Sequence, residues 1–378
     1  MKPPLFPLLT LLLTLTIPFT NAQPPTNCAA SRKLLPPHHF ILTEQPDNPN
    51  LTTLSTIFTS LNRRVPISIL FTTTNRALSN PTTTSSYTRW TFQSGDNTTP
   101  KWIPQGISST ADALDKGTYE GHDGWVISWH RDDDKSVRVS FVNRKDNTYR
   151  HALLVYPHME DDFTEVPIHA GGVVWYGDTL WVVDTRRGVR VFDLGNVWEV
   201  DVGGGIGKVG EGRYEAREYR FVVPQVRWYK WTGAFPFRFS YISLDRTATP
   251  DTLMVGEYQP NTTVPIRMVQ YPLDYTTRRL RMDGRVATAT WAYCVGIERM
   301  QGAVQADGKV YISRSNGASR GDMFGWVPGK IAHNNEGFFP RSPEDLSYDK
   351  RGKKLYGLTE HEGQRYIIST DTSKVKSD

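Results

Sequence analysis

The sequence has few cysteines and, after its first residues, no long apolar segment. It contains two cysteines, Cys28 and Cys294, in 378 residues. Neither lies in a CxxC motif or near a suitable histidine, which argues against a zinc site built on them. No segment after residue 22 is long and apolar enough to span a bilayer, so we expect no membrane span. Helical periodicity is almost absent, which disfavours a TIM barrel and an α/β-hydrolase fold.

Several common catalytic and nucleotide-binding motifs are also missing. The chain has no P-loop, GxSxG elbow, HExxH motif or EF-hand loop. Gly205–Gly210 matches GxGxxG, but EGRYEAREYR follows it and leads into another strand, so we expect an insertion between strands. The formal net charge is only +5, and no nucleic-acid-binding motif accompanies the arginines. We therefore expect no nucleic-acid partner.

The first 22 residues have the pattern of a secretory signal peptide. Lys2 supplies the charge, Leu8–Ile17 the apolar run, and Thr20–Ala22 a cleavage site of small residues. We expect the mature chain to begin near Gln23 and to be a secreted, extracellular monomer.

In an oxidising compartment, an isolated pair of cysteines is expected to be bonded, which predicts a Cys28–Cys294 disulfide. Three Asn-X-Thr sequons predict N-glycosylation at Asn50, Asn97 and Asn261.

Residues 23–86 are rich in proline, threonine and asparagine and predict a partly irregular N-terminal arm. We expect this arm to pack on the main domain. Within it, Leu51–Leu61 predicts a short helix and Val65–Thr73 predicts a strand.

Residues 87–378 repeat one pattern of short strands and tight turns. In residues 169–194 the strands read GGVVWYG, TLWVVD and GVRVFDL, separated by turns rich in glycine and aspartate. The same arrangement occurs four more times. Such repetition predicts an all-β fold, a β-propeller of five four-stranded blades, with six blades as the alternative. The last unit lacks one strand, and we expect Tyr87–Gln93 to complete it by pairing with Arg365–Thr370.

Polar residues stand where the first strand of each unit begins. These starts are Gln105-Gly106, His169, Phe239-Ser240, Gln301-Gly302 and Glu344-Asp345. First strands line the central channel of a propeller, so we expect these side chains to converge at its mouth. A second polar set follows the second strands, at His130, Asp184 with Arg186, Glu257, Arg314, and Glu360 with His361. The alternative is that these groups only satisfy one another and a column of water.

From this convergence we assign roles. The candidate catalytic residues are His169, Glu344 and Asp345. The candidate ligands of a divalent cation such as calcium are Gln105, His169, Gln301 and Glu344. The candidate substrate-binding residues are Asp184, Arg186, Arg314 and His361. We expect the glycines beside His169 to leave room above it.

The motifs PQGISSTAD, HAGGVVWYGDTLWVVDTRRGVRVFDL, YRFVVPQV, FSYISLD, MQGAV, SPEDLSY and LTEH occur in this order between residues 102 and 370. In this order they resemble a group of secreted bacterial and fungal proteins that are predicted β-propellers with no assigned activity. More loosely, the units resemble gluconolactonase-like and strictosidine-synthase-like propellers. That resemblance implies a divalent cation at the channel mouth, although the acidic ligands are not all matched here.

Two functions of different classes follow. The first is an extracellular hydrolase or lyase that acts on a saccharide or lactone at the channel mouth. The second is a non-catalytic propeller that binds glycans or a protein through the same face.

Overall fold

The computed structural model describes residues 33–377, and most of its strands lie in groups of neighbouring antiparallel strands. The predicted signal peptide and Cys28 lie outside the described residues. The first group is β7 (Trp102–Ser109), β8 (Gly124–Arg131), β9 (Val137–Asn143) and β10 (Thr148–Met159). The second is β12 (Val173–Tyr176), β13 (Thr179–Asp184), β14 (Gly188–Asp193) and β18 (Phe221–Trp231).

Three further groups follow the same order from inner to outer strand. The third is β19 (Tyr241–Asp245), β20 (Thr252–Gly256), β21 (Arg267–Asp274) and β24 (Trp291–Cys294). The fourth is β25 (Met300–Ala306), β26 (Lys309–Asn316), β27 (Ser319–Trp326) and β28 (His333–Asn335). The fifth is β29 (Pro343–Asp349), β30 (Lys354–Thr359), β31 (Tyr366–Asp371) and β6 (Thr88–Thr91).

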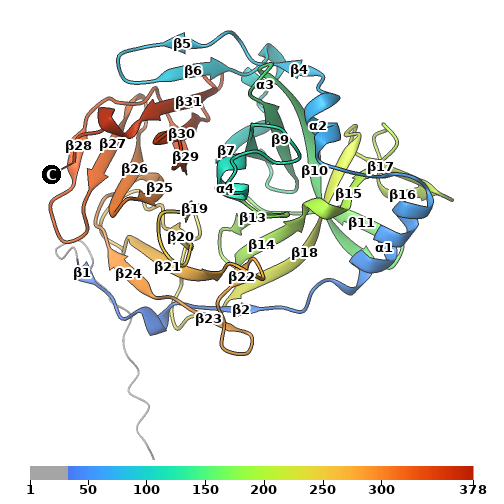
Figure 1. The fold of residues 1–378 in the computed structure, drawn as a ribbon, viewed down its shortest axis with the longest axis horizontal. Coiled ribbons are helices and arrows are strands. Elements are labelled where there is room, and N and C mark those ends of the chain that lie inside the picture. The colour runs from blue at the N-terminus through green and yellow to red at the C-terminus, as the bar shows by residue number, and fades with distance from the viewer. Residues whose placement is uncertain (1–32, 378) are drawn as a thin grey trace, which may run out of the picture.

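The first strands of these groups form a closed cycle around the centre of the molecule. β7 contacts β12, β12 contacts β19, β19 contacts β25, β25 contacts β29, and β29 contacts β7 again. Figure 1 shows the groups placed around this centre. The arrangement is that of an all-β propeller, as the strand repeats predict. The pairing of β6 with β31 confirms the expected closure by an N-terminal strand.

The strands are buried on both faces because each sheet packs against the next. The apolar side chains form one cluster between each successive pair of groups, including the pair formed by the fifth and first. At that last junction the rings of Trp125 and Tyr356 meet edge to face with centroids 5.5 Å apart. Burial of this kind on both faces explains why the strands are near-continuous runs of valine, isoleucine, leucine and aromatic residues.

Glycines on the inner strands let neighbouring backbones approach closely. A Cβ atom added at Gly106 would lie 2.4 Å from the backbone nitrogen of Val173, and one added at Gly172 would lie 2.6 Å from that of Ile242. The glycines beside His169 were expected to leave open room above it. Instead, the space beside Gly171 and Gly172 is filled by the backbone of the next sheet.

The N-terminal arm runs around the outside of the propeller (Figure 1). Its elements are β1 (Lys33–Leu34), β2 (Ile41–Glu44), α1 (Pro49–Ser60), β3 (Arg64–Val65), α2 (Ser68–Thr72), β4 (Arg76–Ala77) and β5 (Thr82–Thr83). β1 extends the third group by pairing with β24, and β2 pairs with β18. The helix α1 lies where the sequence predicts one.

The segment expected to be a strand, Val65–Thr73, is mostly the helix α2 instead. Ile67, Leu70 and Phe71 stand at i, i+3 and i+4 and all join the cluster between the first two groups. This spacing matches one face of a helix, so tertiary burial decides the conformation in favour of the helix.

The remaining strands and α-helices lie outside the five strand groups. They are β11 (Asp162–Glu165), β15 (Val197–Glu199), β16 (Ile206–Gly210), β17 (Arg213–Ala216), β22 (Arg279–Leu280), β23 (Val286–Thr288), α3 (Ser94–Asn97) and α4 (Thr110–Ala113). β16 and β17 form a hairpin, so the GxGxxG match is the expected insertion between strands. The outer strands β10 and β18 pair in parallel, which joins the first and second groups at their periphery.

Candidate functional site

A cavity of about 650 Å³ lies where the inner strands begin, and we call it the mouth pocket. Gln105, His169, Ser240 and Gln301 line it from the starts of four different strand groups. The segment 184–187, which follows β13, lines it as well. The topology therefore gathers residues that are far apart in sequence, as the positions of the inner strands predict.

The mouth pocket contains only some of the candidate residues. Those that line it are Gln105, His169, Asp184, Arg186 and Gln301. Those that do not are Glu344, Asp345, Arg314 and His361.

Each of the two glutamines of the mouth pocket donates a hydrogen bond to a glutamate. Nε2 of Gln105 donates to Oε2 of Glu360 over 2.8 Å. Nε2 of Gln301 donates to Oε1 of Glu344, also over 2.8 Å. A cation bound by Gln105, Gln301 and Glu344 would have to displace these hydrogen bonds or bind beside them. Each glutamine is thus already engaged with a carboxyl group.

Glu344 and Asp345 are buried below the mouth pocket. Burial, with a contribution from the neighbouring charges of Glu360 and Asp345, raises the pKa of Glu344 well above its usual range. Burial also raises the pKa of Asp345 strongly, although the backbone N–H groups of Leu346 and Val173 act against it. Burial thus favours the protonated form of both carboxyl groups, and neither of them lines the mouth pocket.

The remaining candidate residues, Arg314, His361 and Asp184, each contact another charged side chain. Nε of Arg314 lies 3.1 Å from Oδ2 of Asp322, beside a separate shallow hollow of the fourth group. Nε2 of His361 lies 3.1 Å from Nη1 of Arg341. Asp184 does line the mouth pocket, but its carboxylate already accepts from Arg190.

His169 belongs to a cluster with His130 and Asp134. Oδ1 of Asp134 lies 3.1 Å from Nδ1 of His169 and 2.6 Å from Nδ1 of His130. The two imidazole centroids are 4.1 Å apart. Burial, with the adjacent charge of His169, lowers the pKa of His130 to about 4, so this imidazole is neutral at physiological pH.

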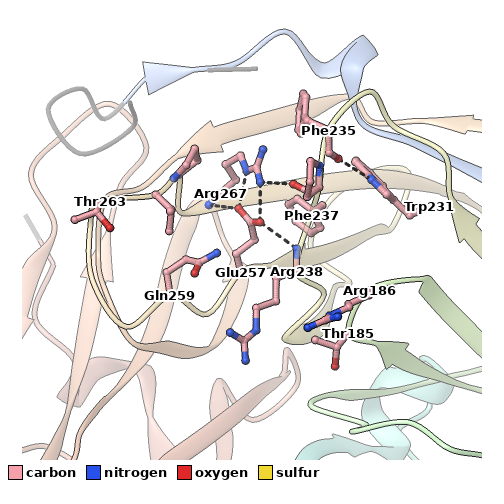
Figure 2. A pocket seen from close by; sticks show the side chains of 13 residues that line it. Thr185, Arg186, Trp231, Phe235, Phe237, Arg238, Glu257, Gln259, Thr263 and Arg267 are labelled. Atoms are coloured by element: carbon pink, nitrogen blue, oxygen red, sulfur yellow. Dashed lines mark hydrogen bonds and ion pairs between the residues drawn. The ribbon is translucent and has the colours of Figure 1, made fainter. Parts of the chain in front are cut away.

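A second cavity, of about 630 Å³, adjoins the mouth pocket, and we call it the aromatic pocket (Figure 2). Trp231, Phe235 and Phe237 line one side of it. Glu257 also lines it, but its carboxylate is held by Nε of Arg267 at 2.6 Å. Thr185, Arg186 and Arg238 line both cavities, so one ligand can reach from one into the other.

Three arginines of the mouth pocket have no acidic partner. Within residues 33–377, the guanidinium groups of Arg186, Arg187 and Arg238 form no ion pair with a carboxylate. Figure 2 shows the side chains of Arg186 and Arg238 free of any marked interaction, while the backbone N–H of Arg238 donates to Glu257. Arginine is the preferred partner of carboxylates and phosphates, because its planar guanidinium group can donate two parallel hydrogen bonds.

Sequence reasoning missed three residues of this region, and it placed Glu360 beside His361 at the mouth without assigning it a role. Asp134 lies in the hairpin turn after β8. Arg187 and Arg238 lie in connections between strands. The run RDDDK directly after His130 was the available signal, because a tight turn returns Asp134 to the side of the histidine four residues earlier.

The predicted modifications concern three asparagines and one cysteine of the described chain. Asn261 is exposed, whereas the amide of Asn97 donates to the carbonyl of Gly363 over 3.2 Å and Asn50 is half-buried. Cys294 is buried opposite Lys33 in the register of β1 and β24. Glycosylation and the Cys28–Cys294 disulfide stay predictions.

The strand arrangement defines the chain as a β-propeller with a polar channel mouth. No family model and no curated protein matches the sequence. Among solved structures, the Cps50 (Swd1) β-propeller domain of Myceliophteria thermophila is similar over 79% of this chain and 100% of that domain, with 8% identity and a TM-score of 0.37. The Dos1 propeller is similar over 78% of this chain and 67% of that chain, with 8% identity and a TM-score of 0.25. Among the described residues, no helix has the length and apolar character needed to cross a bilayer.

Proposed function

We propose that the protein is a secreted β-propeller that binds a carboxylate-bearing saccharide in the mouth pocket. The observation that carries this proposal is the set of three arginines without a carboxylate partner, Arg186, Arg187 and Arg238. Cations that line one cavity repel one another, and an anionic ligand relieves this repulsion. The planar guanidinium groups also match a carboxylate geometrically, with two parallel hydrogen bonds.

The acids of the mouth pocket do not neutralise these arginines. Oδ2 of Asp184 lies 2.9 Å from Nη2 of Arg190, so the negative charge of Asp184 is balanced by Arg190. Burial raises the pKa of Glu360, and its carboxyl group already accepts a hydrogen bond from Gln105. Asp134 faces two histidines. The pocket therefore remains attractive to an anion.

A saccharide is the anion that suits the remaining lining. Ser240, Tyr258 and Gln301 offer hydroxyl and amide groups for the hydroxyls of a sugar ring. The adjoining aromatic pocket offers Trp231 and Phe237 for an apolar face of the same ligand. The predicted signal peptide supports delivery to an environment where acidic polysaccharides occur.

Isothermal titration calorimetry with oligogalacturonates, and with neutral galacto-oligosaccharides of equal length, tests this function. We expect binding of the acidic oligomer only, and binding that weakens as salt is added. Arg186→Gln and Arg238→Gln should each weaken binding by about tenfold or more, because a charge-assisted pair is lost.

Arg213→Gln is the matched control. It removes the same charge from the exposed β16–β17 hairpin, away from the mouth pocket. Equal weakening by Arg213→Gln, or equal affinity for the neutral oligomer, would show that the arginines of the mouth pocket are not a specific carboxylate site.

Glu360 favours cleavage of the bound saccharide as a second candidate function. This carboxyl group lines the mouth pocket, its pKa is raised by burial, and it interacts electrostatically with His169. A protonated carboxyl can donate to a leaving oxygen while the His169–Asp134 pair accepts a proton. Mass spectrometry of oligogalacturonate after incubation separates hydrolysis, which adds water, from elimination, which leaves a carbon–carbon double bond. Glu360→Gln should abolish product formation and leave affinity unchanged; intact oligomer after incubation with the unmodified protein would leave binding as the function.

A further inference from the structure

We propose that His130, Asp134 and His169 bind a divalent transition-metal ion at the rim of the mouth pocket. One ligand atom from each of these residues lies within 4.8 Å of the other two. Within residues 33–377, this is the one group of three or more histidine, cysteine or acidic side chains whose ligand atoms lie so close together. The inference goes beyond saccharide binding and does not depend on it.

The distances in the cluster are close to those across a coordinated ion. Two ligand atoms that are each about 2.1 Å from a metal, at angles of about 90° to 109°, lie about 3.0 to 3.4 Å apart. Oδ1 of Asp134 lies 3.1 Å from Nδ1 of His169 and 2.6 Å from Nδ1 of His130. Shifts of a few tenths of an ångström in the Asp134 side chain would therefore admit an ion.

The turn that carries Asp134 is fixed by its own hydrogen bonds. The backbone N–H of Arg131 donates to Ser136 over 2.9 Å, and that of Asp134 donates to Arg131 over 2.8 Å. Nε of Arg131 also lies 2.7 Å from Oδ1 of Asp133, which holds the turn from the outside. Asp134 itself has a φ of 55°, a left-handed conformation that aspartate tolerates. The turn thus presents its carboxylate toward His130 from a defined backbone.

His169 is held from the opposite side of the site. Ala170 follows it with a φ of 57°, and the next residue, Gly171, packs against the carbonyl of Ser240 in the neighbouring sheet. His130 is buried at the end of β8, and its Nδ1 also lies 2.9 Å from the carbonyl of Arg131. An ion bound at this nitrogen therefore replaces its contact with the carbonyl of Arg131.

The donor set selects the class of metal. Two imidazoles with one carboxylate suit zinc and other first-row transition metals, whereas calcium takes oxygen ligands in larger number. The side chains of Asp134 and His169 are 51% and 43% exposed, so further coordination positions face the mouth pocket. An ion there adds positive charge beside the arginines. It also removes His169 as a proton acceptor, a role that a metal-bound water can take in the cleavage candidate.

Zn²⁺ alone is the probe for this site. The full secreted chain is stripped with a chelator, dialysed against Zn²⁺ and analysed for retained metal, with calorimetry for affinity. We expect one ion per chain, with the single proton of the neutral His130 imidazole held on the ring nitrogen that does not bind the ion. Protein that retains no zinc overturns the proposal.

Three variants assign the ion to these residues. His169→Ala and Asp134→Asn should each lower the affinity for Zn²⁺ by at least about a hundredfold. His158→Ala is the matched control, because His158 pairs with Asp162 four residues later at 3.8 Å but has no second histidine in the group. Undiminished affinity in His169→Ala, or equal loss in His158→Ala, overturns the proposal.

Two further measurements keep the outcomes separate. Unchanged melting temperatures of the His169 and Asp134 variants show that lost affinity is not lost folding, as expected for half-exposed side chains. Oligogalacturonate binding by the stripped protein is measured independently. Zinc binding without saccharide binding rejects the proposed function alone, and saccharide binding without zinc binding rejects the metal site alone.

Discussion

Ile367 lies opposite Trp90 in the antiparallel pairing of β31 with β6. Trp90 in turn meets Trp125 of the first strand group edge to face, with ring centroids 5.1 Å apart. The last sheet thus combines a C-terminal strand with one that precedes the first sheet, and its aromatic side chain reaches the next sheet. The strand β6 therefore both closes the ring and packs the fifth strand group against the first.

The closure predicts a large effect of a single side chain. Ile367→Ala should lower the free energy of unfolding by about 2–5 kcal/mol, because Ile367 is fully buried at the junction of the fifth and first groups. Ile331→Ala is the control, since Ile331 is 70% exposed, and it should change stability by less than about 0.5 kcal/mol. Denaturant unfolding of both variants checks this. Deletion of residues 364–378 should destabilise still more, since it removes β31; a deletion variant that melts like the full chain would disprove closure by this strand.

The inner glycines predict a steric effect. A Cβ at Gly302 would lie 2.6 Å from Cα of Asp345, so Gly302→Ala must push two backbones apart and should be strongly destabilising. Gly95→Ala should be neutral or slightly stabilising, because a Cβ added at Gly95 would have no atom within 4 Å and Gly95 is helical. Thermal unfolding of the pair measures the contrast, and equal melting temperatures would refute the close approach of the inner strands.

Asp112 predicts a pH dependence of stability. Burial raises its pKa from 3.8 to about 6, against hydrogen bonds from Ser347 and Ser108. A carboxyl whose pKa is higher in the folded state contributes stability that is fully present below about pH 3.8 and is lost as the pH rises through about 6. The stability of the unmodified protein relative to Asp112→Asn should therefore fall by about 3 kcal/mol across this window. Urea unfolding at several pH values checks this, with the exposed Asp283→Asn as control; a difference that stays constant with pH would contradict it.

The Cys28–Cys294 disulfide is a prediction from the sequence that thiol chemistry can test. Titration of the denatured, unreduced protein should find no free thiol. Reduction should lower stability by about 4 kcal/mol or more, since the bond closes a very long loop. Two thiols in the unreduced protein would reject the pairing.

The strands and the closure could be predicted because their signals are local. Residues 173–193 carry the turn residues and β-forming side chains of three strands, and β12, β13 and β14 occupy them. The missing strand of the last unit pointed to Tyr87–Gln93. The helix α2 was missed because its helical spacing covers only Ile67, Leu70 and Phe71, and the cluster that these side chains enter is made by other parts of the chain.

The candidate site was predictable only in outline. The starts of the inner strands placed Gln105, His169 and Gln301 correctly around one cavity. Which of them is free depends on side-chain pairs between distant segments, such as Gln105 with Glu360. Within residues 33–377, Arg238 has no acidic partner. This too depends on the folded surface, so it could not be predicted from the sequence.

The closing strand also sets the order in which the molecule can be assembled during synthesis. β6 emerges before every inner strand, while β31 emerges after all of them. At about 5–20 residues per second, β6 waits on the order of tens of seconds for its partner. Throughout that interval the nascent chain presents unpaired strand edges, which are templates for pairing with other chains. In the completed ring β6 is paired with β31, whereas the growing chain presents that edge of β6 until its last strand arrives.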